Sequence, residues 1–272
     1  MPSNDSTSIT GRLLRDSEWT VMRRVIGALI LRELLTRYGR NNLGFLWLFI
    51  EPMLFVGVVV AIRSTIRSAG FSVDFPVVAF ALTGWTSLLL WRNMPGRCIG
   101  AHKSNLSLLY HRPVTLLDVY TARVVVEFLA ITTAFVALSL ACYAMGWVPT
   151  PEDLLQVFSG WMLLAWFGMA LGWTIGGLSE KSELVGNLWR PFSYVLMISS
   201  GVFFLADSLP ENIREIALWL PMLNALEYLR EGWFGTMFRA HYDILYVIVC
   251  NLVLTFSGLS LVRQAGTDVS EE

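Results

Sequence analysis

Glu51 is the residue of this 272-residue sequence that raises the sharpest question of chemistry. It lies inside an apolar stretch, residues 44–62, and Pro52 follows it. A carboxylate inside hydrocarbon is costly, so it indicates a function or an internal partner. Alternatively, because proline removes a backbone donor, the pair can mark a helix break near an aqueous end of the stretch, where a charge is solvated. Both interpretations remain open.

Signatures of catalysis, metal binding and nucleotide binding are missing. The three histidines lack H-x-x-H spacing, the three cysteines lack zinc-type spacing, and no G-x-S-x-G occurs. The segment Gly176-Gly177-Leu-Ser-Glu-Lys181-Ser182 is superficially similar to a phosphate loop, but no Gly-Lys pair exists anywhere in the chain. We expect no catalytic residue, metal site or cofactor here, and any ATP-driven motor must be a separate polypeptide.

Tryptophans are abundant, with 11 in the chain. Aromatic belts at the membrane surface explain many of them, including Trp47. Trp161, Trp166 and Trp173 nevertheless lie within the apolar stretch 154–178, and flat indole faces suit sugar rings. A path lined for sugars is therefore an alternative to a simple belt.

The elements that must position these residues are membrane helices. The chain is 55% hydrophobic and only 15% charged, whereas a soluble domain carries about 25% charged residues. With a net charge of -1, no nucleic-acid partner is indicated. We predict an all-α, polytopic bundle with six membrane spans, since a span needs about 20 apolar residues. The spans are 44–62, Val77–Trp91, Phe128–Trp147, Leu154–Leu178, Leu184–Ala206 and Ile244–Val262.

Two patterns predict contacts within the bundle. Gly168, Gly172 and Gly176 share one face of a span, which lets another helix approach closely. Arg123 and Glu127 are four residues apart, so we expect them to pair on one helix face.

Basic residues predict the orientation. Of the 20 lysines and arginines, 15 fall in the termini and in the loops on their side, and the remaining five fall in the opposite loops. By the positive-inside rule, both termini face the cytoplasm. The expected organisation is a flexible cytoplasmic tail at 1–18, a cytoplasmic interface helix at 19–43, a six-span domain at 44–262 and a second cytoplasmic tail at 263–272.

Two segments are predicted not to span. Trp19–Tyr38 contains a short apolar run bracketed by arginines, which fits an amphipathic helix at the membrane surface with snorkelling side chains. Between Asp207 and Asp243, the spacing of Ser208 and Glu211 indicates a capping box that starts a helix, and Pro221 separates it from a second one. We interpret these as short external helices that dip into the bilayer. A plain surface hairpin is the alternative.

Several motifs, in order, resemble those of the membrane subunits of ABC-type capsular polysaccharide exporters. The likeness covers residues 20–262, and its sequence elements are Arg32-Glu33, Arg37-Tyr38-Gly39-Arg40, Leu43-Gly44-Phe45, Trp47, Glu51-Pro52, Trp91-Arg92-Asn93, Asn105 to Val114, Leu218 to Pro221 and Glu227. Pro95-Gly96 departs from the pattern, because the family has continuous helix there.

The resemblance implies a homodimer bound to two copies of a cytoplasmic ABC ATPase, which would bind the ATP and magnesium. It also implies an inner-membrane polysaccharide co-polymerase, an outer-membrane export channel and a lipid-linked polysaccharide as cargo. The protein would then be a multi-pass protein of the bacterial inner membrane, and an interface helix at Trp19–Tyr38 would belong to the shared design.

The resemblance further implies roles for individual residues. Coupling to the ATPase is expected at Lys103, Asn105, Tyr110, His111, Arg112, Glu180, Lys181 and Glu183, and the external gate at Pro210, Trp219, Pro221, Glu227 and Arg230. We expect contacts to cargo or its linker lipid at Arg37, Arg40, Trp47, Glu51, Trp161 and Trp166. Arg37 and Arg40 are chosen because guanidinium groups suit phosphate, although they can equally be orientation signals.

Other functions remain as alternatives. An exporter of a different polysaccharide, such as O-antigen or teichoic acid, would share most of these features. A polytopic enzyme acting on lipid-linked sugars would need a convergent acid-base or metal cluster, and no such pattern is found. A secondary transporter would show an internal repeat and charged residues at the membrane midplane, and the central parts of these spans are uncharged.

Overall fold

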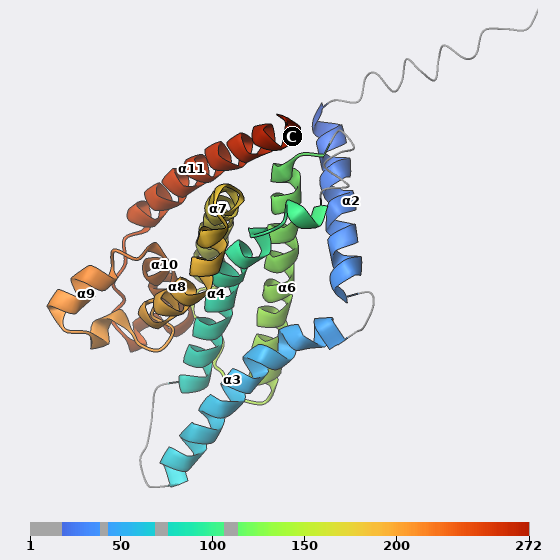
Figure 1. Cartoon of the computed structure of the whole chain (residues 1–272). Coiled ribbons are helices and arrows are strands. Elements are labelled where there is room, and N and C mark those ends of the chain that lie inside the picture. Colours follow the sequence, from blue (N-terminus) through green and yellow to red (C-terminus); the bar gives the residue numbers. More distant parts are fainter. Residues whose placement is uncertain (1–17, 39–42, 69–75, 106–113, 272) are drawn as a thin grey trace, which may run out of the picture.

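The computed structural model describes residues 18–38, 43–68, 76–105 and 114–271 (Figure 1). These ranges contain helices and no strand, which confirms the all-α prediction. The α-helices are α2 (Glu18–Tyr38), α3 (Leu43–Ser68), α4 (Val77–Cys98), α6 (Leu116–Ala144), α7 (Leu154–Lys181), α8 (Glu183–Ser199), α9 (Glu211–Ala217), α10 (Pro221–Phe234) and α11 (Ile244–Glu271). Three short 3-10 helices are η1 (Lys103–Asn105), η2 (Ala206–Ser208) and η3 (Gly235–Met237).

Within the described ranges, three helices are long and apolar enough to cross a membrane: α6, α7 and the Ile244–Gly266 part of α11. The apolar part of α3, Phe49–Ile62, is shorter. In α4, Arg92, Asn93 and Arg97 near the end lower the mean hydropathy of an otherwise apolar helix. Six crossings therefore remain a prediction beyond these three clear candidates.

The fifth predicted span is shorter than expected. α8 has 17 residues, and at about 1.5 Å per residue it is shorter than a hydrocarbon core of about 30 Å. It ends at Ser199, whereas the sequence predicted helix as far as Ala206. The chain turns at Gly201, whose φ of 81° is a conformation that glycine adopts readily.

The α7 helix lies at the centre of the bundle and packs closely against α4. A Cβ atom added at Gly168 would lie 2.8 Å from the Cα atom of Trp91, and one added at Gly176 would lie 2.7 Å from the Cβ atom of Cys98. Gly172 approaches Met94 at 3.4 Å by the same measure. The predicted close approach at the three glycines is confirmed, and its partner is α4.

Other glycines let α7 approach two more helices. A Cβ atom added at Gly160 would lie 2.8 Å from the Cβ atom of Leu229 in α10, and one at Gly177 would lie 2.8 Å from that of Leu261 in α11. Small residues at such crossings allow van der Waals contact between backbones, which is a main source of helix association in lipid.

Two prolines lie within helices. Pro52 is inside α3, so the helix break that the sequence allowed at Glu51-Pro52 does not occur. Pro95 is inside α4, which continues to Cys98, so the departure from the family pattern leaves the helix intact. Proline within a membrane helix is tolerated where neighbouring groups satisfy the freed carbonyl.

The expected capping box at the start of the external helices is wrong. α9 begins at Glu211 with Pro210 as its N-cap and no side-chain capping hydrogen bond. The hydroxyl of Ser208 instead donates to the carbonyl oxygen of Leu205, at 2.7 Å. The separation into two helices at Pro221 is correct, because Pro221 occupies the first position of α10.

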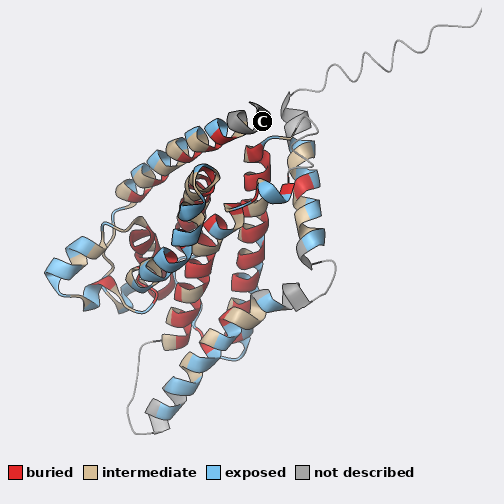
Figure 2. Cartoon of the chain, viewed as in Figure 1, coloured by how far each residue is buried: buried red, intermediate tan, exposed pale blue. Residues whose placement is uncertain are grey.

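Burial differs strongly between helices (Figure 2). Buried residues concentrate in α4, α6, α7 and α10, whereas α9 has none. In α2, Leu29 is buried but Leu31 and Leu35 are exposed, so its leucines do not all turn towards the bundle.

Candidate functional site

The described polar contacts at one end of the bundle join α2, η1 and α6. Arg32 in α2 donates from Nη1 to Oδ1 of Asn105, at 2.9 Å. Arg123 in α6 donates from Nη2 to the hydroxyl of Ser104, at 2.8 Å, and its Nε lies 3.7 Å from Oε2 of Glu33. The short η1 helix is therefore held from two sides.

The predicted pairing of Arg123 with Glu127 is wrong. Glu127 is fully buried, and it accepts from Nε of Arg97 at 2.9 Å and from Nδ2 of Asn93 at 3.1 Å. Both partners lie in α4. Helix spacing alone could not predict the pairing of Glu127 with α4. A partner on an adjacent helix can bind the carboxylate in place of the residue four positions away.

The same end includes the junction of α7 and α8. Oε1 of Glu180 accepts from the hydroxyl of Tyr120 at 2.9 Å, and Oε2 lies 3.7 Å from Nδ1 of His102. Lys103 forms an ion pair with Glu183. Their hydrogen bond raises the pKa of Lys103 and lowers that of Glu183, so both remain charged at neutral pH.

Lys181 donates to Oε1 of Gln264 at 2.6 Å, which connects this end to α11. Five of the residues expected to couple to an ATPase thus lie in one contact region at this end. They are Lys103, Asn105, Glu180, Lys181 and Glu183. Tyr110, His111 and Arg112 lie outside the described residues.

The predicted cargo contacts are scattered. Arg40 and the side chain of Arg37 lie outside the described residues, and Trp47 is 58% exposed on α3. Trp161 is buried, stacks on Phe135 at 4.4 Å between ring centroids, and donates to the hydroxyl of Thr132 at 2.9 Å. Trp166 is half-buried and donates to the hydroxyl of Thr255. Among the described residues, no contact joins Trp47 to Trp161 or Trp166.

The opposite end of the bundle contains two charged residues of the expected gate. Glu227 and Arg230 of α10 are both fully buried. Nη1 of Arg230 donates to the carbonyl oxygen of Gly201 at 2.6 Å, and Nη2 donates to that of Val202 at 3.2 Å. Its guanidinium also lies 3.8 Å from the ring centroid of Phe80.

Glu227 completes the same arrangement. Its Oε1 accepts from the backbone N–H of Ala206 at 3.2 Å, and its Oε2 accepts from that of His241 at 3.4 Å. Spacing could not reveal these partners, because they are backbone groups 14 to 29 residues away along the chain. Of the other expected gate residues, Trp219 is 78% exposed, Pro210 is the N-cap of α9, and Pro221 is the first residue of α10.

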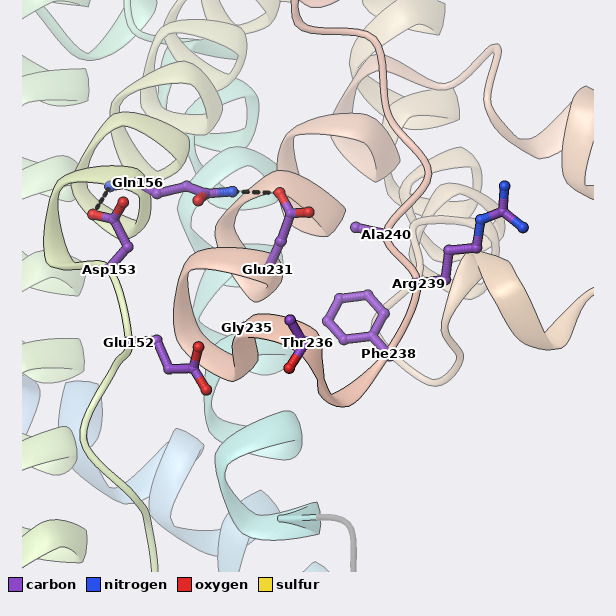
Figure 3. A pocket seen from close by; sticks show the side chains of 9 residues that line it. All are labelled: Glu152, Asp153, Gln156, Glu231, Gly235, Thr236, Phe238, Arg239 and Ala240. Carbon is purple, nitrogen blue, oxygen red and sulfur yellow. Dashed lines mark hydrogen bonds between the residues drawn. The ribbon is translucent and has the colours of Figure 1, made fainter.

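A polar cavity of about 680 Å³ lies at this end, between the start of α7 and the end of α10 (Figure 3). Oε2 of Glu231 accepts there from Nε2 of Gln156 and from the hydroxyl of Tyr242, both at 2.6 Å. Burial raises the pKa of Tyr242 to about 12, so the phenol remains a donor at physiological pH. The cavity is lined by Glu152, Asp153, Gln156, Glu231, Gly235, Thr236, Phe238, Arg239 and Ala240.

The contacts of charged side chains thus form two groups at opposite ends of a largely apolar bundle. Within the described part of the chain, no group of three histidine, cysteine, aspartate or glutamate side chains could hold a metal ion. Comparison with known families decides the assignment, since residues 24–234 match the membrane family described as ABC-2 type transporter. The chain belongs to this family.

Relatives of this ABC-2 transporter chain are proteins of capsule export. It is 40% identical over 252 residues to the capsule polysaccharide export inner-membrane protein CtrC of Neisseria meningitidis serogroup B, covering 93% of this chain and 95% of the relative. It is 39% identical over 244 residues to the capsule polysaccharide export inner-membrane protein BexB of Haemophilus influenzae, covering 90% and 92%. It is 27% identical over 252 residues to the polysialic acid transport protein KpsM of Escherichia coli, covering 91% and 95%.

Proposed function

We propose that this chain is the transmembrane subunit of an ATP-driven exporter that moves lipid-linked capsular polysaccharide across the bacterial inner membrane. The observation that carries the proposal is the similarity to capsule export inner-membrane proteins over at least 90% of both chains. A membrane subunit of the ABC-2 family works with an ATPase, and this sequence contains no Gly-Lys pair for a nucleotide loop.

The proposed topology has six crossings, with both termini in the cytoplasm. Its support is the separation of polar contacts into two groups. Segments predicted to be cytoplasmic contact one another, as in the Arg32–Asn105 and Lys181–Gln264 hydrogen bonds. Segments predicted to be external also contact one another, since the N–H of Asp153 donates to the carbonyl oxygen of Gly232 at 2.8 Å. An alternating chain requires this separation.

The proposed assembly is a homodimer with two copies of a cytoplasmic ATPase that binds ATP and magnesium. Support for the dimer comes from α3 and α8, which carry exposed apolar side chains such as Leu54, Val58, Leu188 and Val195. The co-polymerase and the outer-membrane channel are proposed as partners because of the resemblance to the exporter family.

The proposed mechanism begins at the cytoplasmic end. ATP binding would draw the two ATPase subunits together and displace η1, with the residues that contact it, from its resting position. Because Arg32 and Arg123 connect η1 to α2 and α6, that displacement would reach the membrane helices. The spans at the dimer axis would then separate, and the external helices α9 and α10 would open towards the exit.

The test is capsule export in a strain that lacks its own membrane subunit but retains the other export genes. We expect this chain, expressed in that strain, to restore surface polysaccharide and to co-purify with the export ATPase of the strain. Chain inserted at normal levels that purifies without an ATPase and restores no capsule would contradict the proposal. Restoration of O-antigen instead of capsule would assign a different cargo.

A further inference from the structure

The Trp91-Arg92-Asn93 motif has one residue whose role the bundle does not explain. Trp91 is 1% exposed and packs edge-on against Phe167, with ring centroids 6.0 Å apart. Asn93 donates to the buried Glu127. These two residues therefore hold α4 against α7 and α6. Arg92 lies on a different side of α4 and contacts α8.

Arg92 has few partners for a guanidinium inside a membrane bundle. Its Nε donates to the hydroxyl of Ser193 at 3.3 Å, and its guanidinium lies 4.3 Å from the ring centroid of Tyr194. Arg97 donates only from Nε, to Glu127, and its side chain is 42% exposed. Among the described residues, the terminal nitrogens of Arg92 and Arg97 donate no hydrogen bond, so both planar groups retain free donors.

Glu51 completes the cluster from α3. The charged groups close enough to act on it are Arg92, Glu127 and Arg97. Glu51 is half-buried, and within the described ranges it forms no hydrogen bond and no ion pair within 4.0 Å. Of the two carboxylates, Glu127 therefore has hydrogen-bond partners in α4, whereas Glu51 lies within electrostatic range of the arginines without pairing with them.

The depth of the cluster agrees with a role on the cytoplasmic side. Arg92 precedes the end of α4 at Cys98 by less than two turns, or about 9 Å at 1.5 Å per residue. Charged side chains at such depth are costly unless they pair or bind a ligand. Two partly exposed arginines with free donors match the planar, bidentate recognition that phosphate requires.

We propose that Arg92 and Arg97, with Glu51 opposite them, form a binding site for a lipid-borne phosphate. The identification of that phosphate with the linker lipid of a polysaccharide cargo rests on the proposed function. The arginines supply the attraction, and the negative charge of Glu51 weakens it. A site balanced in this way captures the phosphate without holding it permanently, which a transport path requires.

The test measures binding of an alkyl phosphoglycoside, in which a phosphodiester joins the alkyl chain to the sugar, by the purified full chain in maltoside micelles. The matched probe is the same alkyl glycoside without phosphate. We expect the wild-type chain to prefer the phosphodiester by about tenfold or more. Equal binding of the two probes by the wild-type chain would overturn the proposal.

Variants with opposite expected effects separate a binding role from misfolding. Arg92→Gln should remove most of the preference for phosphate, because the guanidinium supplies the attraction. The variant should still fold, since the only described partners of Arg92 are Ser193 and Tyr194. Glu51→Gln should increase the preference, since a repulsive charge is removed. Arg190→Gln, at an exposed arginine of α8, is the matched control and should change nothing. An unchanged preference in Arg92→Gln, or a weaker one in Glu51→Gln, would refute the site.

Two further measurements identify the source of the phosphate and distinguish a failure of this inference from a failure of the proposed function. Competition by phosphatidylglycerol at the content of an ordinary membrane would assign the site to bilayer lipid, whereas its failure to compete would assign the site to the linker of the cargo. If the wild-type chain restores capsule but Arg92→Gln binds the phosphate probe equally well, only the site fails. If the wild-type chain restores no capsule, the proposed function fails whatever the probe shows.

Discussion

Arg230 shows how one buried side chain can organise backbone that is not helical. The chain between α8 and η2 is not helical, so its carbonyl groups lack helical hydrogen-bond partners. Arg230 donates to three of these carbonyls, those of Gly201, Val202 and Phe204. Glu227 lies one turn away and balances its charge. A lysine could not make these contacts, because it lacks the planar arrangement of donors.

At the residue scale, we predict that Arg230→Met is strongly destabilising. The change removes the positive charge that acts on the buried Glu227 and leaves three carbonyls without their donor, and each buried polar group left unsatisfied costs about 1–3 kcal/mol. The measurement is the thermal midpoint of the purified chain in micelles. Arg239→Met, at an exposed position in the same region, is the control. Equal midpoints for the two variants would show that the guanidinium does not hold the turn.

At the element scale, the helices are mostly foreseeable from sequence, whereas their ends and partners are not. Long apolar stretches predicted α6, α7 and α11, and the glycines of α7 predicted a close crossing. Pro52 favoured a helix break, but α3 is continuous at this position. A proline in the sequence does not show how the surrounding helices pack, so it could not predict this. The spacing of Ser208 and Glu211 predicted a capping box, but the hydroxyl of Ser208 donates to the carbonyl oxygen of Leu205 instead.

The candidate site was predictable only in outline. Family likeness selected Glu180, Lys181 and Glu183 as one group, and the structure joins them to α6, α11 and η1. The Arg97–Glu127 pair was missed, since its members lie 30 residues apart and only the packing of α4 against α6 brings them together. Long-range polar contacts of this kind leave no periodic signal in a single sequence.

We predict that alanine at two helical glycines has opposite effects on stability. Gly176→Ala should destabilise the chain by about 1–3 kcal/mol, because the new methyl group would overlap Cys98 and Tyr120. Gly57→Ala in α3 meets nothing within 4 Å and should stabilise the helix by up to about 1 kcal/mol. Thermal midpoints of the two variants in micelles provide the comparison. A stabilising Gly176→Ala would mean that α7 and α4 are not closely packed.

At the scale of the whole molecule, the described polar contacts around η1 join seven helical elements through few side chains. Arg123 is central among them, because it contacts Ser104 in η1, Glu33 in α2 and the carbonyl oxygen of Arg97 in α4. Its neighbours belong to segments that the proposed mechanism requires to move together. Arg123 is therefore a positioning residue that would pass the displacement of η1 by the ATPase to the membrane helices.

We predict that Arg123→Ala lowers the amount of polysaccharide exported per ATP hydrolysed while hydrolysis continues. Losing the side chain removes the hydrogen bond between α6 and η1, so movement of η1 at the ATPase would no longer be passed to α6 through this contact. The ratio of transport to hydrolysis is measured on the co-purified complex in vesicles, with Arg263→Ala, at an exposed position in α11, as the control. An unchanged ratio would contradict this role, and loss of the complex in purification would assign Arg123 to assembly instead.

The contacts of α11 have a consequence for the order in which the protein is made. α7 emerges from the ribosome well before α11, yet the hydroxyl of Thr255 accepts from Trp166, and the side-chain amide of Asn251 donates to the carbonyl oxygen of Leu163. Until the last helix is synthesised, these groups on α7 lack their final partners. The nascent bundle is therefore incomplete until translation is nearly finished, and a truncated chain leaves the indole N–H of Trp166 without its described acceptor.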